Sequence, residues 1–337
     1  MFSRPQVKAD WALAELRQLI AYDETTPDDE LGVEFELEGP GVLGVAMKFN
    51  EDIPGKAKLW RYHQDLSLNK SGAEFVLAKP MHRTLVVEAV EELFHELKKS
   101  AEIQLSRRCS THIHQNFQHR SVNQIYLYLV LHYVLEEAMF KAISPDRYGN
   151  NFCVPLVLSD AISEDLIGWL YANKIKKIQT GSSQIKTKYR ALNFDSLINY
   201  GSLEDRMMGG CDDPKKFFKW MDVKLELYDF AKNHERLTPD FFLQQFSGKG
   251  FQLFVKEMFP KTWDFIKDVP NVDAILNRGI FASQDIAYAV DWSPVMSGTK
   301  PSKVRKSDPT IGVKTLSSFS TSYHQTLAQG LQVDENF

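Results

Sequence analysis

The sequence contains little cysteine and no long apolar run. Its three cysteines, Cys109, Cys153 and Cys211, lie far apart, and no two have CxxC spacing. Such a sparse, odd set excludes a disulfide framework and argues against a structural zinc site. No run approaches the roughly 20 apolar residues that cross a bilayer, and charges interrupt the first 30 residues, where a signal peptide would need an apolar core. These absences predict a cytoplasmic protein without a membrane partner.

The chain also lacks an excess of charge and a P-loop. It has 40 Lys and Arg against 44 Asp and Glu, a net charge of -4, so nothing indicates bulk attraction to nucleic acid. No GxxxxGK[ST], GxSxG or HExxH motif is present, and the GxGxxG spacing of GPGVLG at 39–44 is interpreted as the turn that ends a strand. If the protein uses a nucleotide, we therefore expect side chains on strands to hold it, rather than a glycine-rich loop.

What the chain does have is a hydrophobic content of 43%, enough for a substantial core, and clear periodicity. Period-two alternation predicts strands at 31–38, 58–62, 73–78, 108–117, 186–194 and 197–207. Helical spacing predicts helices at 10–22, 83–99, 121–143, 163–177, 213–233 and within the Phe-rich stretch 238–267. Glycines at 39 and 41 should end the first strand, and 42–49 should return as its hairpin partner.

The order of these elements is mixed, without strict βαβ alternation. It favours an α+β fold built on a largely antiparallel sheet. We predict a single catalytic domain over 1–291, with a motif-bearing core at about 30–232 and a helical part at 233–291. Residues 292–337 are rich in Ser, Thr, Lys and Pro and predict a polar tail or arm.

The strand at 31–38 carries glutamates at alternate positions. Glu34, Glu36 and Glu38 share one face, while the apolar residues between them point into a core. Like charges on one face repel each other, so either water solvates them or a cation neutralises them. Carboxylate oxygens without thiolates suit Mg²⁺ or Mn²⁺. From this segment alone both explanations stay open.

Two further strands carry polar rows. His112 and His114 share a face that Asn116 continues, which is moderately specific for a metal or phosphate site. Glu204 and Arg206 stand at i and i+2, as either a surface ion pair or, beside a polyphosphate, a metal ligand and a charge-neutralising clamp.

Single residues add weaker indications. Glu74 lies among apolar residues, where it either faces solvent or binds a metal, since an unpaired buried carboxylate is costly. Asp65 lies in a turn-like segment. Arg147 could cap the helix before it, and Lys188 could be an ordinary exposed lysine. Cys109, three residues from His112, should face the opposite side of the strand, which argues against a Cys–His nucleophile.

The order of the segments GVEFE, DLSL…GAEFVLAKP, STHIH, RYGNNFC, KYRALNF and SLEDRMMGG resembles the amidoligase family, the carboxylate–amine ligases with a glutamine-synthetase-like fold. The resemblance spans residues 32 to about 230 and is closest to the stand-alone members of phages and bacteria. Beyond about residue 235 no motif matches. Asp205 departs from the family, which tends to have an aromatic or apolar residue there; it should point away from the site.

The resemblance implies a curved antiparallel sheet with helices on its outer face and with ATP and Mg²⁺ or Mn²⁺ on its concave face. The implied metal ligands are Glu34, Glu36, Glu74, Glu204 and one of His112 and His114. Residues implied to contact ATP or the transferred phosphate are His112, His114, Asn116, Asn193, Arg206, Arg147 and Lys188. Asp65 could orient or deprotonate the amine, or simply bond its own backbone in a turn.

The leading hypothesis is an ATP-dependent ligase that joins a small-molecule or peptide carboxylate to an amine through an acyl phosphate. A metal-dependent hydrolase and a non-catalytic binding protein on the same fold remain alternatives. The sequence does not identify the two substrates or the oligomeric state. If the gene is of phage origin, the host cytoplasm is the expected location.

Overall fold

The computed structural model of the protein describes residues 25–51, 58–158, 189–234, 237, 242–243 and 251–288. The chain divides into two compact units, 1–298 and 299–337, and every described residue belongs to the first. The helices predicted at 10–22 and 163–177, Lys188, and the tail predicted at 292–337 lie outside the described residues.

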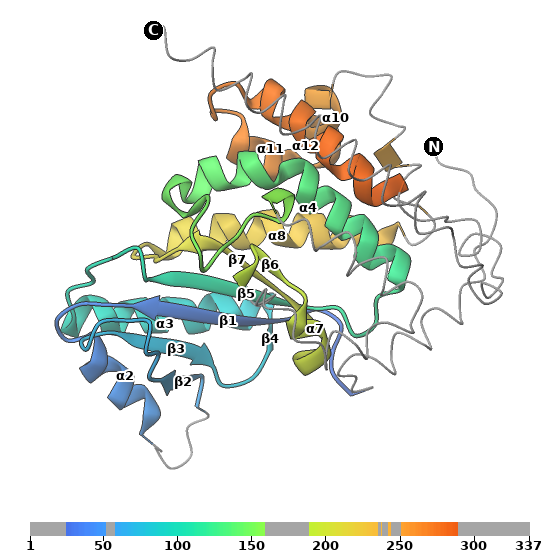
Figure 1. The fold of residues 1–337 in the computed structure, drawn as a ribbon. Helices are drawn as coiled ribbons and strands as arrows, with labels where there is room; N and C mark the ends of the chain where they lie inside the picture. Colours follow the sequence, from blue (N-terminus) through green and yellow to red (C-terminus); the bar gives the residue numbers. More distant parts are fainter. Residues whose placement is uncertain are drawn as a thin grey trace, which may run out of the picture. The chain divides into compact units, whose positions relative to one another are not determined.

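The described strands form one antiparallel sheet of seven strands in the order β2-β3-β1-β5-β7-β6, with β4 paired to β1 beside this path (Figure 1). The predicted antiparallel sheet is therefore confirmed. The strands are β1 (Glu30–Leu37), β2 (Trp60–His63), β3 (Ala73–Leu77), β4 (Met81–His82), β5 (Ser110–Asn116), β6 (Leu192–Asn193) and β7 (Ser202–Gly209).

Alternation along β1 separates the two faces of the sheet. Val33 and Phe35 are fully buried on one face, and Glu34 and Glu36 lie on the other because successive side chains point to opposite sides. Strand register carries this division across the sheet: Phe35 lies opposite Phe75 of β3, and Glu34 lies opposite His112 of β5. One face is consequently apolar and the other polar.

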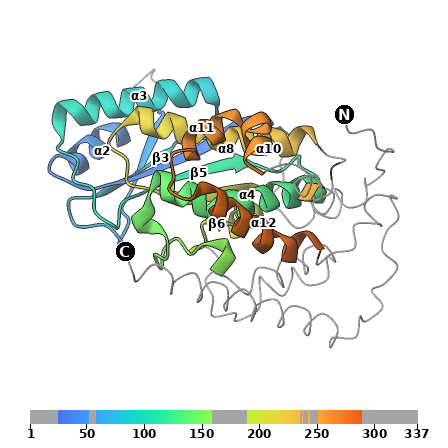
Figure 2. The same cartoon turned by 90° about the horizontal axis from the view of Figure 1, so that it is seen from above.

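Helices cover the apolar face. Phe35 contacts Phe94 of α3 (Arg83–Ser100) and Phe217 of α8 (Pro214–Asn233), with ring centroids 5.3 and 5.0 Å apart. Figures 1 and 2 show α8 and α4 (Val122–Ile143) on the sheet, with α10 (Phe251–Met258), α11 (Pro260–Ile266) and α12 (Val272–Tyr288) beyond them. No described helix is both long and apolar enough to cross a membrane.

The predicted hairpin partner at 42–49 is wrong, because this segment is helix α2 (Val42–Asn50). Its buried residues Val42, Val45 and Ala46 have helical spacing. Gly41 has φ of 84°, and a Cβ there would lie 2.2 Å from the Ser100 carbonyl oxygen. The glycines therefore let this loop pack closely against the chain after α3, rather than turn a hairpin.

The strand predicted at 197–207 is wrong in its first part, which belongs to helix α7 (Asp195–Tyr200). Gly201 ends this helix in the left-handed conformation with φ of 69°, and β7 begins at the next residue. At 189–194, the described part of the strand predicted at 186–194, only β6 is a strand. There the Asn193 side chain accepts the Asp195 N–H at 2.9 Å and starts a turn into α7.

Beneath β7 lies a buried ionic network on the helix side. Asp205 forms an ion pair with Lys224 of α8 at 2.7 Å, and both side chains are at most 1% exposed. Asp205 also accepts the Trp220 indole N–H at 3.2 Å and faces His132 Nε2 at 3.4 Å. Burial raises the pKa of Asp205, but Lys224 and His132 outweigh it and hold that pKa below its ordinary value. The expectation that Asp205 points away from the polar face is confirmed.

Glu136 of α4 continues this network. It is fully buried and accepts the backbone N–H groups of Leu156 and Val157 at 2.8 and 3.2 Å. Burial raises the pKa of Glu136 to about 8 despite these bonds. Burial also lowers the pKa of His132 to about 4. The network thus ties α4, α8 and the 156–157 turn to the strand that carries Glu204 and Arg206.

Candidate active site on the polar sheet face

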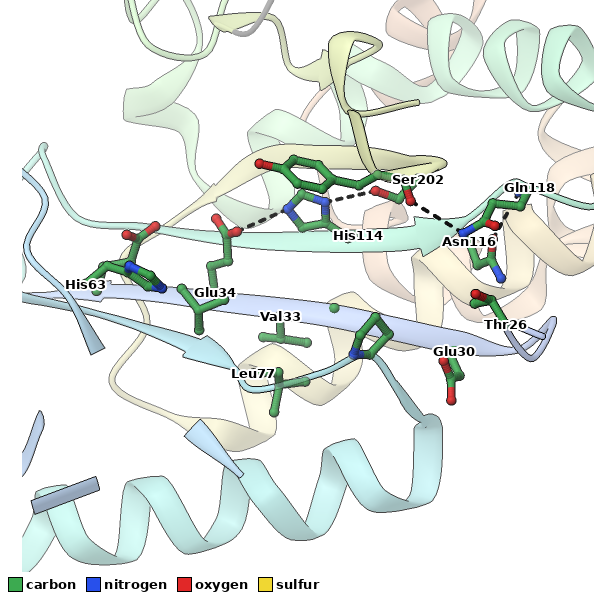
Figure 3. Close-up of a pocket in the computed structure, with 15 residues that line it drawn as sticks. Thr26, Glu30, Val33, Glu34, His63, Leu77, His114, Asn116, Gln118 and Ser202 are labelled. Atoms are coloured by element: carbon green, nitrogen blue, oxygen red, sulfur yellow. Dashed lines mark hydrogen bonds and ion pairs between the residues drawn. The ribbon is translucent and has the colours of Figure 1, made fainter. Parts of the chain in front are cut away.

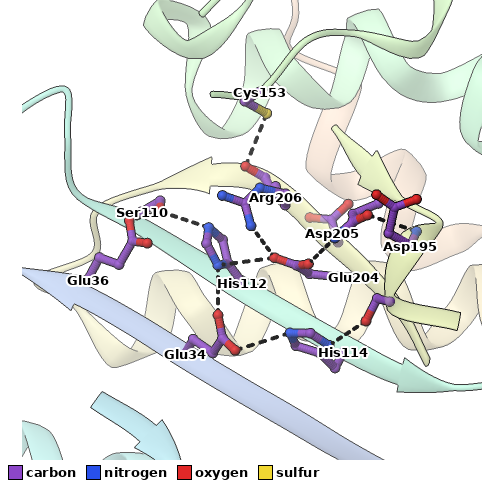
Figure 4. A network of polar contacts seen from close by, with 12 residues as sticks. Glu34, Glu36, Ser110, His112, His114, Cys153, Asp195, Glu204, Asp205 and Arg206 are labelled. Carbon is purple, nitrogen blue, oxygen red and sulfur yellow. Dashed lines mark hydrogen bonds and ion pairs between the residues drawn. The ribbon is translucent and has the colours of Figure 1, made fainter. Parts of the chain in front are cut away.

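Seven side chains with metal-binding or charged groups converge on the polar face, each at an alternate position of its strand. They are Glu34 and Glu36 of β1, Glu74 of β3, His112 and His114 of β5, and Glu204 and Arg206 of β7. Figure 4 shows those on β1, β5 and β7, and strand register sets Glu74 of β3 opposite Glu36. The sequence predicted all seven as site residues. The register of the sheet brings them together.

Glu34 stands at the centre of this group. Its carboxylate lies 2.9 Å from His112 Nδ1 and 3.3 Å from His114 Nε2. Burial raises the pKa of Glu34, but the hydrogen bonds and charges of the two histidines outweigh it and hold the pKa well below its ordinary range. Glu34 is therefore a carboxylate at neutral pH, and a negative centre between two rings.

Glu204 is the second buried carboxylate. It pairs with Arg206, accepts the Asn193 side-chain N–H at 2.6 Å, and lies 3.3 Å from His112 Nδ1. Burial raises the pKa of Glu204, but the charges of Arg206, His112 and His114 together outweigh it and hold that pKa below its ordinary value. In turn, burial lowers the pKa of Arg206, while Glu204 and Glu36 raise it above its ordinary value. The Glu204 carboxylate and the Arg206 guanidinium therefore each stabilise the charged form of the other.

Serine hydroxyls support both histidines. The Ser110 hydroxyl donates to Glu36, and its oxygen lies 2.8 Å from His112 Nε2. His114 Nδ1 lies 3.1 Å from the hydroxyls of both Ser196 and Ser202. These serines were missed in the sequence, although Ser110 begins the same period-two row that contains His112 and His114. That row was the available signal.

Two groups of side chains have the spacing of cation ligands. In the first, ligand atoms of Glu34, His114 and Glu204 all lie within 4.8 Å of one another. In the second, the same holds for carboxylate oxygens of Glu36, Asp65 and Glu74. The second set is all oxygen and the first has one imidazole, a donor chemistry that fits Mg²⁺ or Mn²⁺. His112 touches two of these carboxylates but belongs to neither group.

The second group contains an electrostatic conflict that a cation would relieve. Burial and the charges of Glu34, Glu36 and Asp65 raise the pKa of Glu74 to about 8. Asp65 also accepts the Ser67 N–H at 2.6 Å, as expected for a turn residue that bonds its own backbone segment. It is therefore both a turn residue and a neighbour of Glu74. Sequence analysis did not predict Asp65 as a cation ligand, because Asp65 reaches the group from a loop.

Two other predicted residues, Arg147 and Asn116, have partners outside the carboxylate groups. Arg147 donates to the Cys109 carbonyl at 3.2 Å. Asn116 donates to the Pro27 carbonyl at 2.8 Å and accepts the Gln118 N–H at 3.0 Å. Cys109 is buried, and burial raises the pKa of its thiol, which does not suit a nucleophile.

The remaining predicted residues are Asn193, which orients Glu204, and Lys188, which lies outside the described residues. The roles in catalysis and in ligand binding that the sequence suggested for these residues stay predictions.

A cavity of about 400 Å³ opens beside the two groups and runs along β1 (Figure 3). Glu34 and His114 line one end, and Glu30 and Thr26 line the other. Glu74 lines the cavity as well, and its register partner is Glu36, two residues beyond Glu34 on β1. Val76, Leu77, Pro80, Tyr200 and His63 also line it. The sequence analysis predicted none of these five residues, because their contribution depends on which strands are neighbours.

Part of the chain that carries this polar face matches a known protein family. Residues 76–227 match the family model described as "Putative amidoligase enzyme". The matched range contains His112, His114, Glu204 and Arg206, and it begins two residues after Glu74. No curated protein shows significant sequence similarity to the chain. Over residues 76–227 the chain therefore carries a domain of the amidoligase family.

Proposed function

We propose that the protein is an ATP-dependent carboxylate–amine ligase that forms an amide or isopeptide bond. The observation that carries this proposal is the meeting of two carboxylate groups with Arg206 on one sheet face, within and next to the segment that matches the amidoligase family. The antiparallel sheet with helices on its apolar face is also consistent with a glutamine-synthetase-like catalytic fold.

The reaction would proceed in two balanced steps. A carboxylate oxygen attacks the γ-phosphorus of ATP and ADP leaves, which converts a poor acyl donor into an acyl phosphate. The amine nitrogen then attacks the carbonyl carbon, inorganic phosphate leaves with the C–O electron pair, and the nitrogen loses a proton. Positioning and neutralisation of phosphate charge are the main tasks in the first step. Mg²⁺ or Mn²⁺, held by Glu34, His114 and Glu204 and by Glu36, Asp65 and Glu74, would supply most of that neutralisation.

The chain's own residues would share the rest. Arg206, held charged by Glu204 and Glu36, would stabilise the transferred phosphate. His112 would hold Glu34 and Glu204 in place from between them, and Asn193 would fix the second oxygen of Glu204. For Asp65 we propose cation binding beside Glu74 as its main role. Nothing described places Arg147 at the phosphate, and its bond to the Cys109 carbonyl favours a structural role.

Nucleotide binding tests this proposal without knowledge of the substrates. A non-hydrolysable ATP analogue should bind the full chain in isothermal titration calorimetry with Mg²⁺ and lose about a hundredfold in affinity in EDTA. Glu204→Gln and Glu34→Gln should weaken binding with Mg²⁺ similarly, because each removes a charged ligand. Glu91→Gln, an exposed acid on α3, is the matched control and should bind as the wild type does.

Turnover distinguishes a ligase from a hydrolase. ADP and phosphate should appear in equal amounts, and only when both a carboxylate pool and an amine pool are present. Unchanged nucleotide binding in both glutamine variants would refute the site assignment. Cleavage of an amide substrate with Mg²⁺ but without ATP would instead favour the metal-dependent hydrolase.

A further inference from the structure

Charges on the polar face are segregated. Arg206 lies on β7, next to Glu204, where the phosphate is proposed to bind. The cavity along β1 and β3 contains the acids Glu30, Glu34 and Glu74, and its described lining includes no lysine or arginine. An anionic ligand group is therefore favoured at β7, and a cationic group is favoured in the cavity.

The cavity has an acid at each end and an apolar wall between them. Glu30 and Glu34 lie four residues apart on β1, which corresponds to about 13 Å along a strand. Val76 lies opposite Glu34 in the register, and Pro80 extends the apolar wall beside it. A ligand with an apolar stem between two polar ends matches this lining.

Glu30 differs from the other two acids of the cavity, Glu34 and Glu74, in lying outside both of the groups whose spacing suits a cation. It is half-buried, and its carboxylate has no hydrogen bond or ion pair with any other described residue; only the more distant charge of Lys79 acts on it. The side-chain amide of Asn116 donates to the Pro27 carbonyl and accepts the backbone N–H of Gln118, and the side-chain amide of Gln118 donates to the Tyr200 carbonyl at 3.5 Å. The edge of a nucleobase would find few free partners here, whereas an ammonium group would find a free carboxylate.

We propose that this cavity binds the amine substrate, and that this substrate is an aliphatic amine with a second cationic group. The reacting nitrogen lies at the Glu34 and Glu74 end, next to the proposed phosphate. The stem crosses Val76 and Pro80, and the second cation pairs with Glu30. This inference rests on the proposed ligase function and names its acceptor class, which excludes free ammonia as the preferred amine.

The spacing selects a probe. If each ammonium nitrogen lies about 2.8 Å from its carboxylate, about 7 Å remains between the two nitrogens. A five-methylene diamine in extended form suits that gap, and 1,2-diaminoethane is too short. We therefore choose 1,5-diaminopentane, with n-pentylamine to isolate the stem and ammonium chloride to isolate the charge.

Binding of these probes to the full chain would be measured by calorimetry with Mg²⁺ and a non-hydrolysable ATP analogue, and again without nucleotide. 1,5-Diaminopentane should bind about tenfold more tightly than n-pentylamine, and ammonium should bind more weakly than either. Glu30→Gln should remove the tenfold advantage of the diamine and leave n-pentylamine unchanged. Val76→Phe, which fills the cavity, should weaken both organic amines about tenfold, and Glu91→Gln should change nothing.

Equal affinity for the diamine and n-pentylamine, or an unchanged diamine affinity in Glu30→Gln, would overturn the inference. If the nucleotide analogue binds but no amine does, the amine site is refuted and the ligase proposal stands. If the diamine binds through Glu30 but no nucleotide binds, the amine site is supported and the ATP-dependent function fails.

Discussion

Replacing Lys224 by methionine should destabilise the protein strongly, although Lys224 lies on the far side of β7 from the polar face. Its ammonium is 2.7 Å from the Asp205 carboxylate, and both side chains are at most 1% exposed. Without Lys224, the buried Asp205 carboxylate keeps the Trp220 indole N–H, the Met207 backbone N–H and His132 as partners, but no lysine or arginine among the described residues. Removing one partner of a buried ion pair typically costs about 3–5 kcal/mol, because the other charge stays uncompensated.

Urea unfolding followed by tryptophan fluorescence would measure this loss, since Lys224 Nζ lies 4.8 Å from the Trp220 ring centroid. The loss should depend on pH with a definite sign. In the wild type the pKa of Asp205 is lowered, so the pair stabilises fully above the ordinary aspartate pKa and less as pH falls through the native value. In Lys224→Met the buried carboxyl can take up a proton instead, so the difference from wild type should shrink as pH falls towards about 4.

The double variant Asp205→Leu/Lys224→Met supplies the control. It removes both charges, and its free energy of unfolding should return to within about 1 kcal/mol of wild type, as replacement of a buried pair by apolar residues often does. A loss below about 1 kcal/mol in Lys224→Met would refute the reasoning. So would a double variant no more stable than the single one.

Three further outcomes follow from the same contacts. Gly41→Ala should lower the free energy of unfolding by at least about 2 kcal/mol, because Gly41 has a positive φ and a Cβ there would clash with the Ser100 carbonyl. Gly44→Ala is the control: its new Cβ meets nothing within 4 Å, so it should be neutral or stabilising. Equal effects of the two substitutions in urea unfolding would contradict this prediction. Glu136 keeps its proton up to about pH 8 in the native state but ionises earlier when unfolded. The free energy of unfolding should therefore fall by up to about 2 kcal/mol between pH 6.5 and 8, a range above the titration of His132. The fall should be smaller in Glu136→Gln. Equal pH dependence of the unfolding free energy in the two proteins would contradict this prediction. Glu74 must release a proton to bind a cation, so the increase in Tm caused by Mg²⁺ should grow between pH 6 and 9, and Glu74→Gln should abolish that growth.

Local periodicity let the sequence predict most of the elements and the side of the sheet on which each site residue lies. Alternation put Glu34 and Glu36 on one face, and it did the same for His112 with His114 and for Glu204 with Arg206. The helices predicted at 83–99, 121–143 and 213–233 are confirmed as α3, α4 and α8, because their apolar residues repeat at the helical period. Asp213 caps α8, which has Pro214 as its first residue, by accepting the Lys215 N–H at 2.9 Å.

Packing distinguishes segments whose pattern is ambiguous. Residues 42–49 are apolar enough for either a strand or a helix, and they form a helix whose buried Val42, Val45 and Ala46 follow a close approach of Gly41 to Ser100. A similar limit applies after Asn193, where a side-chain bond to the backbone begins α7 within a stretch that alternates like a strand. The hydrophobic period and the composition describe one segment of the chain at a time. They therefore do not show whether a tertiary contact outweighs the local preference of that segment for a helix or a strand.

The sequence by itself determined which residue types face the same side of each strand, because side-chain alternation is a local property of the backbone. Only the tertiary structure decided which strands are neighbours and in what register. That register sets Glu36 opposite Glu74 and Glu34 opposite His112, and folding of the loop brings Asp65 to Glu74. The same long-range pairing makes the cavity from Glu34 to Glu30. Strand pairing joins residues far apart in the chain, so alternation alone could predict the polar rows but not the site they form together.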